Sequence, residues 1–239
     1  MVYTLLAVSF LIGFVVFGIG STGIGSISDL FSGGGGGSTS SAYDSQISHA
    51  QAELRKDPKN EQALLNLARY QFLAGQTGVS QTSPTQPPTV SDEATTDFSQ
   101  AVDAWSRYLK LAKKPDPALA SEMAQAYQVL GDVNGAVRAQ RIFAAAQPSA
   151  NTIGQLALYL YASGNLKAGD AAAKRAVAKA PKSLRKNIKT QLAQIRTRAS
   201  KFVKAQKQAA KASGGAQAAK SQLQNPFSGL APSTTPTTP

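Results

Sequence analysis

Apolar and small side chains recur every three or four residues along residues 43–183, and short breaks at glycine or proline interrupt them. This spacing places the apolar side chains on one face of an α-helix. Glycine is typical of the turn that ends a helix, and proline is common just after a helix has ended. The pattern therefore predicts an all-α region built from pairs of helices.

The breaks recur with a constant period. Gly131 and Gly164 lie 33 positions apart, as do Pro115 and Pro148, and Pro148 and Pro181. Two helices in such a period are typical of solenoids, in which each unit buries its apolar face against its neighbours. We therefore expect each glycine to end the first helix of a pair and each proline to follow the second.

Three segments place small and apolar residues at matched positions. They are Leu64, Leu67, Ala68 and Gly75 in the first unit; Met123, Ala124, Tyr127, Gly131, Ala136, Phe143 and Pro148 in the second; and Ile153, Leu156, Ala157, Leu160, Gly164, Ala176 and Pro181 in the third. This set resembles the tetratricopeptide repeat (TPR) of membrane-anchored bacterial-type proteins. The resemblance implies a TPR-like α-solenoid of helix-turn-helix repeats over residues 43–183. Gly169 departs from the family, which usually has alanine at that position.

The first unit is longer than the others. Gly75 and Gly131 lie 56 positions apart, and the excess coincides with residues 76–97, which contain Pro84, Pro87 and Pro88. We expect this segment to be a disordered insertion between the two helices of the unit. The second helix is expected to resume at Phe98, with Trp105 on its buried stripe.

Residues 1–31 are expected to form an N-terminal transmembrane anchor. No charged side chain precedes Asp29, and residues 2–19 are almost all apolar. As a helix that rises about 1.5 Å per residue, this run is long enough to cross a bilayer. Gly18, Gly20 and Gly23 match a dinucleotide-binding fingerprint, but the strand and helix that this site needs are missing around them. A cleaved signal peptide is the alternative, although no basic residue precedes the apolar run.

The anchor is expected to continue into a flexible Gly/Ser linker at residues 32–42. This topology makes the protein a single-pass protein of the cell membrane. The α-amino group before the span and Asp29 after it favour an extracytoplasmic location for the soluble domain.

Residues 184–212 predict a basic amphipathic helix that caps the last repeat. Its apolar stripe comprises Leu184, Ile188, Leu192, Ile195, Ala199 and Phe202. Its basic surface includes Arg185, Lys186, Lys189, Arg196, Lys201 and Lys204. The Ser/Thr/Pro-rich tail at residues 213–239 is expected to be disordered.

Charge is distributed unevenly along the chain. The net charge is +12, with 17 basic residues against 1 acidic residue from Val133 onward, and 8 against 12 before it. Such asymmetry predicts an anionic partner for the rear half. Lipid headgroups are favoured over nucleic acid, because few aromatic residues lie among the basic ones.

Little in the sequence points to catalysis. There are no cysteines and His49 is the only histidine, so a transition-metal site lacks its usual ligands. No Ser/His/Asp set or phosphate loop has the context that its chemistry requires. We therefore expect a protein that is not an enzyme and that has no cofactor, no metal and no catalytic residue.

The TPR resemblance implies a scaffold that binds a protein or peptide partner on its concave face. By position, the partner-binding groove comprises Gln62, Leu65, Arg69, Phe72, Ser121, Gln125, Gln128, Asn151, Leu158 and Tyr161. The alternative hypothesis is an electrostatic binder, in which the basic C-terminal helix holds an anionic membrane surface, an acidic polymer or nucleic acid.

Overall fold

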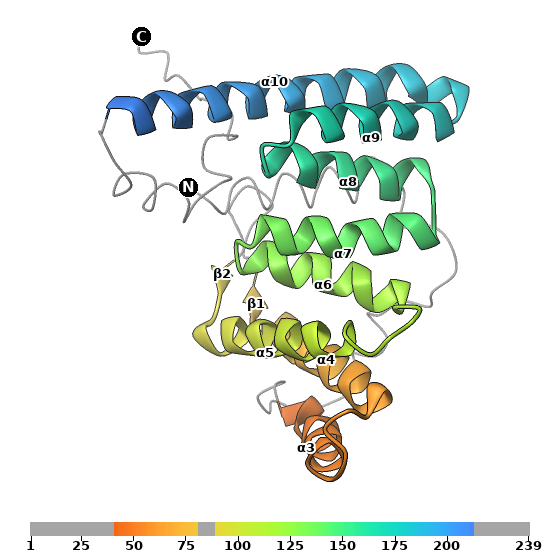
Figure 1. The fold of residues 1–239 in the computed structure, drawn as a ribbon, viewed down its shortest axis with the longest axis vertical. Helices are drawn as coiled ribbons and strands as arrows, with labels where there is room; N and C mark the ends of the chain where they lie inside the picture. The colour runs from red at the N-terminus through yellow and green to blue at the C-terminus, as the bar shows by residue number, and fades with distance from the viewer. Residues whose placement is uncertain (1–40, 81–88, 213–239) are drawn as a thin grey trace. The chain divides into compact units, whose positions relative to one another are not determined.

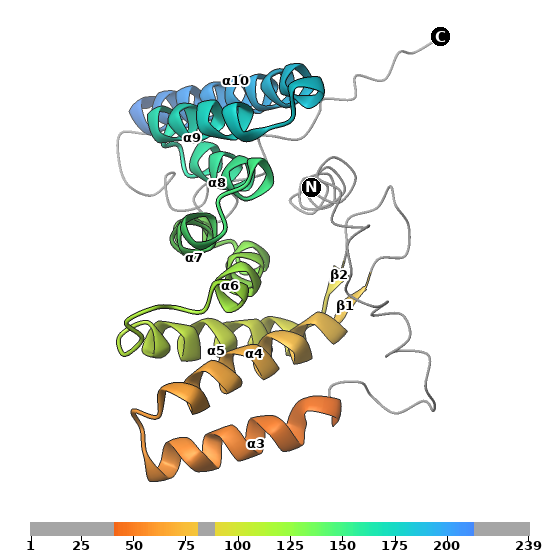
Figure 2. The same cartoon turned by 90° about the vertical axis from the view of Figure 1, so that its right-hand side faces the viewer.

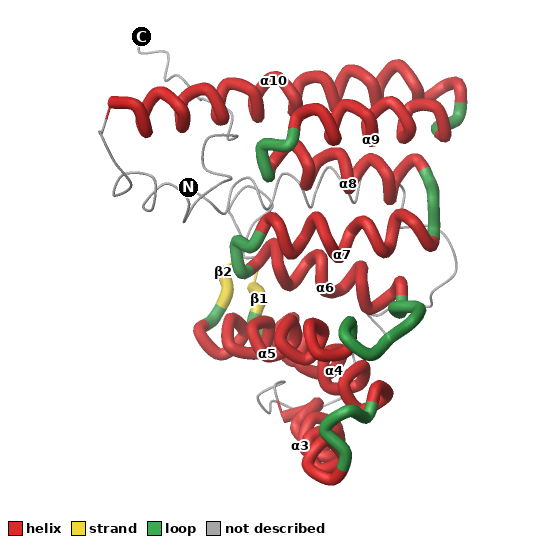
Figure 3. Tube along the Cα trace, in the orientation of Figure 1, coloured by secondary structure: helices red, strands yellow, loops and turns green. Residues whose placement is uncertain are grey.

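The computed structural model describes residues 41–80 and 89–212, and this part of the chain is mostly α-helical (Figures 1 and 3). Its eight helices are α3 (Ser41–Lys56), α4 (Glu61–Thr77), α5 (Asp92–Tyr108), α6 (Pro117–Val129), α7 (Val133–Ala146), α8 (Ala150–Ala162), α9 (Leu166–Lys179) and α10 (Lys182–Ala212). Strands β1 (Val79–Ser80) and β2 (Thr89–Val90) pair antiparallel. Neighbouring helices pack in sequence order within two compact units, residues 41–114 and residues 115–212. This arrangement is consistent with a helical repeat and confirms the prediction of paired helices.

In residues 115–212, the α6–α7 and α8–α9 hairpins turn in the same way. Gly131 and Gly164 have φ of +75° and +78°, a left-handed conformation that glycine adopts without strain. The amide of Asp132 donates to the carbonyl of Tyr127, and the amide of Asn165 donates to that of Leu160, each over 2.9 Å. The turns that the sequence predicted at these two glycines are confirmed, and α7 and α9 are each followed by the expected proline.

An aromatic ring lies on a glycine in each of these hairpins. A Cβ atom built on Gly135 would lie 2.3 Å from a ring carbon of Tyr127, and one on Gly169 would lie 2.5 Å from a ring carbon of Tyr161. Both glycines are buried in the second helix of their pair. The departure from alanine at Gly169 therefore provides room for the ring of the preceding helix.

The last helix covers the end of this unit. In Figure 2, α10 lies along α9, and it packs against both α8 and α9. Ile188, Leu192 and Ala199 are buried, and Ile195 packs against the same core. The predicted apolar stripe is thus confirmed along most of the helix, while Leu184 at its start remains 44% exposed.

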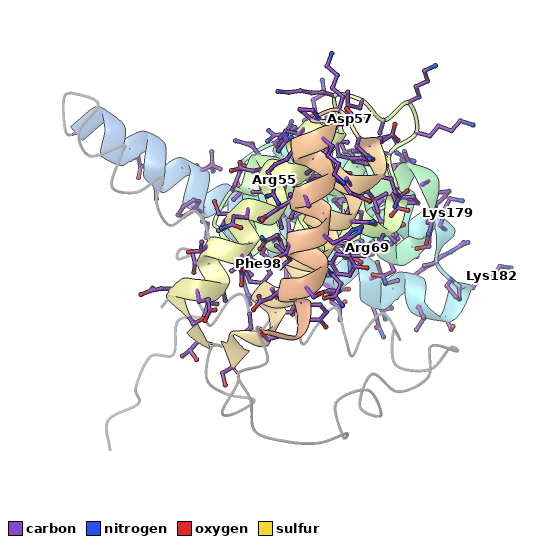
Figure 4. All side chains as sticks on the ribbon, turned by 90° about the horizontal axis from the view of Figure 1, so that it is seen from below. Arg55, Asp57, Arg69, Phe98, Lys179 and Lys182 are labelled. Atoms are coloured by element: carbon purple, nitrogen blue, oxygen red, sulfur yellow. The ribbon has the colours of Figure 1, made fainter. Side chains whose placement is uncertain are left out.

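In residues 41–114, α4 packs against α3 on one side and α5 on the other. Trp105 is 1% exposed, which confirms its predicted place in the core. Phe98, labelled in Figure 4, is fully buried and packs on Gly75, where an added Cβ would lie 3.0 Å from the Phe98 ring. Gly75 lies inside α4 and not at its end, so the turn expected at Gly75 is wrong. The helix instead ends at the cap residue Gly78.

The insertion is shorter than the sequence suggested. Residues 76–77 belong to α4, and α5 begins at Asp92, six residues before Phe98. The side chain of Ser91 caps α5 by accepting a hydrogen bond from the amide of Ala94, and the acidic residues Asp92 and Glu93 favour the first turn of a helix. Between the helices lies the β1–β2 pair, and residues 81–88 lie outside the described chain.

The expected anchor at residues 1–31, the linker up to Ser40 and the tail at residues 213–239 also lie outside the described residues. Within the described ranges, none of the helices combines the length and the apolar character needed to cross a membrane.

Candidate functional site

Five of the predicted groove residues lie on two first helices of the unit at residues 115–212. Ser121, Gln125 and Gln128 belong to α6, and Asn151 and Leu158 belong to α8. All five are half-buried. Because residues four and seven apart share a face of a helix, each helix presents its members on one side. We call these five residues the α6–α8 face.

A tyrosine that is not among the predicted groove residues connects the two helices of this face. The Tyr159 hydroxyl donates to the side-chain oxygen of Gln128 over 2.7 Å. Burial of that hydroxyl raises the pKa of Tyr159 well above its usual range, so the group stays a neutral donor. The bond fixes Gln128, whose amide nitrogen keeps its own donor capacity.

A buried glutamine makes a second connection, from α7 to α8. Gln140 is 1% exposed, and its amide nitrogen donates to the carbonyl of Thr152 over 2.9 Å. The same nitrogen lies 3.3 Å from the side-chain oxygen of Gln155. Next to this contact, the side-chain oxygen of Asn151 is buried without a hydrogen-bond partner among the described residues. A polar residue in an apolar stripe, as at Gln140, is the signal that could have revealed this link.

Tyr161, the sixth groove residue predicted in this unit, points into the core instead. It is 2% exposed, and its hydroxyl donates to Asp170 over 2.9 Å. Arg196 of α10 donates to the same carboxylate over 2.8 Å. Tyr161 therefore belongs to a link that joins α8, α9 and α10, and it presents no surface to a partner.

The charges of this link stabilise one another. The hydrogen bond from Arg196 holds the pKa of Asp170 below its usual range. Burial, helped by the hydrogen bond to Asp170, raises the pKa of Tyr161. Asp170 is the one acidic residue after Asp132, and it lies at the position where it can hold the last helix in place.

The remaining predicted groove residues belong to the unit at residues 41–114. Gln62 is exposed and bonds to Asn66 of its own helix over 2.9 Å. Leu65 and Arg69 are half-buried. Phe72 is 5% exposed and its ring centroid lies 5.7 Å from that of Phe98, so this side chain is part of the core.

The predicted basic surface divides into two groups on α10. Arg185 donates to the carbonyls of Ala180 and Ala178, over 3.0 and 3.1 Å, and so caps the end of α9. Arg196 is held by Asp170. The four lysines, Lys186, Lys189, Lys201 and Lys204, are exposed.

A shallow, open depression lies on the outer side of α10, within the part of the chain that the structure describes. It is lined by Lys186, Lys189, Thr190, Ala193, Gln194 and Thr197. Lys186 and Lys189 thus line the depression, and Lys201 and Lys204 follow it along the helix. Figure 4 labels Lys179 and Lys182, which flank the α9–α10 turn and are also exposed.

Within the described ranges, no three His, Cys, Asp or Glu side chains form a group that could hold a metal ion. Comparison with known protein families and with curated proteins finds no match for this chain. What the structure shows is an all-helical domain of packed helix pairs.

Proposed function

We propose that this protein is a membrane-tethered TPR-like scaffold that binds a peptide or helix of a protein partner on the α6–α8 face. The observation that carries the proposal is the repetition of one hairpin. The α6–α7 and α8–α9 pairs share the same glycine turn, and in each pair a tyrosine ring of the first helix lies on a glycine of the second, with this contact shifted by one position relative to the turn. Such repetition places equivalent residues of α6 and α8 side by side, which is how repeat proteins build an extended binding surface.

The chemistry of the α6–α8 face supports this role. It combines the amides of Gln125, Gln128 and Asn151 with the apolar side chain of Leu158. The amide of Gln125 can donate to and accept from the main chain of a bound peptide, and the amide nitrogens of Gln128 and Asn151 can donate to it. A half-buried leucine offers an apolar contact. The face carries no charged side chain of its own, so we expect a partner recognised by main-chain hydrogen bonds and apolar contacts.

The second helices of the hairpins present a different surface. Arg138 and Arg141 of α7 and Lys174 and Arg175 of α9 are exposed. These charged positions resemble an ordinary solvated surface, and they serve as internal controls for the binding experiment.

Site-specific photo-cross-linking in cells tests the proposal. A photoreactive phenylalanine analogue at Gln125 or Leu158 is expected to give a discrete cross-linked product, and the same analogue at Arg141 or Lys174 is not. Equal products from both sets, or products from α7 and α9 alone, would place the partner elsewhere.

The membrane tether is part of the proposal and depends on residues 1–31. Their apolar run without charge has the length of a membrane span. A single-pass anchor would leave the helical repeat outside the bilayer, joined to it through the Gly/Ser-rich residues 32–42. We place the repeat on the extracytoplasmic side of the cell membrane.

A further inference from the structure

We propose that the outer side of α10 is a binding site for the surface of an anionic phospholipid bilayer. The site comprises Lys186, Lys189, Lys201 and Lys204, which we call the lysine stripe. This function is additional to partner binding on the α6–α8 face, and it involves α10, the last helix of the described residues.

The lysine stripe lies on the side of α10 that faces away from the core. Ile188, Leu192 and Ala199 turn α10 toward α8 and α9, so the opposite side of the helix faces solvent. Lys186 and Lys204 are separated by 18 positions, which is five full turns and about 27 Å along the axis. Their side chains therefore leave the helix in the same direction. Lys189 and Lys201 lie about 60° to either side of that direction, so all four charges face one way and suit a planar surface.

The lysine stripe has no counter-charges on its own helix. The sequence of α10 contains no acidic residue over its 31 positions. An ordinary solvated helix mixes both signs, because pairs of opposite charge four residues apart stabilise it. None of the four lysines takes part in the ion pairs found among the described residues. Packing on α9 explains the apolar side of α10 but not this excess of positive charge.

Arginine and lysine have different roles on α10. Arg185 and Arg196 serve the fold, by capping α9 and by holding Asp170. The outward row is lysine, with Arg198 exposed at its flank. Lysine is a compact charge on a flexible stem, whereas arginine is the residue that reads phosphates and bases in a fixed geometry. A lysine row therefore fits a fluid array of lipid headgroups.

The surface between the lysines also favours lipid over nucleic acid. Thr190, Ala193 and Thr197 lie there, and no aromatic side chain is available on this side for stacking on bases. A second copy of the chain is a poor partner, because residues 41–114 carry eight acidic and eight basic side chains and so have no net charge to offer.

The test uses the full chain, which has no cysteines of its own. A cysteine replaces Thr197 between the lysines and carries a nitrobenzoxadiazole dye, whose emission rises and shifts to the blue in a lipid surface. The protein is reconstituted into nanodiscs of phosphatidylcholine alone or with about 30% phosphatidylserine. Emission is expected to rise severalfold only with phosphatidylserine and to return to its starting value in about 0.5 M NaCl, where charges are screened within a few ångströms.

Two variants that lose the same number of positive charges distinguish an effect of the lysine stripe from an effect of net charge. One replaces the stripe, with K186Q, K189Q, K201Q and K204Q. The other replaces four exposed lysines of the other unit, with K56Q, K59Q, K113Q and K114Q. The first variant is expected to lose the phosphatidylserine-dependent rise in emission, because four lysines near an anionic surface together favour the contact by about a thousandfold. The second variant is expected to retain the rise.

Three results would overturn the proposal. They are an equal rise in emission on neutral and anionic discs, an equal loss of that rise in the two variants, and a return of the emission to its starting value when duplex DNA is added to anionic discs at the same phosphate concentration. The last result would assign the stripe to nucleic acid. Unfolding midpoints measured by circular dichroism are the control for folding, and both variants are expected to unfold at the wild-type midpoint.

Discussion

At the scale of single residues, glycines have two different structural roles in this fold. Gly131 and Gly164 allow a left-handed turn, whereas Gly135 and Gly169 make room for a tyrosine ring. A methyl group would be tolerated differently in the two cases. At the first pair the backbone would be strained, and at the second pair the ring would have to move.

This distinction predicts the outcome of two alanine substitutions. Gly169→Ala should lower the free energy of unfolding by about 1–3 kcal/mol, because its Cβ overlaps the Tyr161 ring. Tyr161→Leu in the same chain should recover part of the loss. Gly131→Ala should cost roughly 1–2 kcal/mol through backbone strain alone, since nothing lies within 4 Å of its added Cβ. Urea unfolding followed by circular dichroism measures each, and rescue of Gly131→Ala by Tyr127→Leu would contradict this assignment.

The Asp170 carboxylate predicts a dependence of stability on pH. Its pKa is lowered in the folded state by the hydrogen bond from Arg196, so it contributes stability above its unfolded pKa of about 3.9. That contribution is lost as the pH falls through the lower folded pKa. The difference in unfolding free energy between the wild type and Asp170→Asn should therefore shrink as the pH falls below 4. A constant difference between pH 6 and pH 3 would show that Asp170 acts by some other route.

Some residues of the fold could be predicted and others could not, for physical reasons. Gly131 and Gly164 stand between two apolar stripes, so a turn is the natural interpretation, and it is correct. Gly75 has the same surroundings in the sequence, but Phe98 of a distant helix packs on it. Tyr161 likewise lies at a groove position by spacing, yet the missing side chain of Gly169 admits its ring to the core. Sequence spacing does not reveal such contacts between helices.

At the scale of secondary-structure elements, α10 is the helix whose role the sequence specified best. Its apolar stripe predicted a cap, and the stripe is buried against α8 and α9. The helix contains no acidic residue of its own, and Asp170 of α9 supplies the carboxylate that binds it. The start of α5, by contrast, was predicted too late in the chain, because the capping residue Ser91 lies in the polar run before Phe98.

Two leucines of α10 give a matched test of its packing. Leu192 is 4% exposed and Leu184 is 44% exposed. Leu192→Ala should lower the free energy of unfolding by about 2–5 kcal/mol, because it leaves a cavity in the core. Leu184→Ala should change it by about 0.5 kcal/mol or less. Equal effects of the two substitutions in urea unfolding would show that α10 is not docked as described.

At the scale of the whole molecule, the chain contains an apolar segment, a region of packed helix pairs that is consistent with a helical repeat, and a basic C-terminal part, in that order. The helical character of the middle was predictable, because periodicity of apolar residues is a strong signal over helix-length segments. The five residues of the α6–α8 face were chosen by their positions in the sequence. Position could not identify Tyr159, because its contact with Gln128 depends on how α6 and α8 meet.

The proposed membrane topology can be measured because the chain has no cysteines. Single cysteines at Ser40 and Ser213 are expected to react with a membrane-impermeant maleimide in intact cells, since both would flank an extracytoplasmic domain. A cytoplasmic domain would give labelling only after the cells are lysed. The cysteine-free wild type is the control for background labelling.

The proposed binding of a protein partner on the α6–α8 face is tested most directly by one pair of variants. Gln125→Arg places a charge on this face, and Asn134→Arg places the same charge on the exposed start of α7. With the partner identified by cross-linking, titration calorimetry should show at least about thirtyfold weaker binding for Gln125→Arg, as expected for a central contact of an interface. Asn134→Arg should bind like the wild type. Equal affinities for all three proteins, with unfolding midpoints unchanged, would contradict the account.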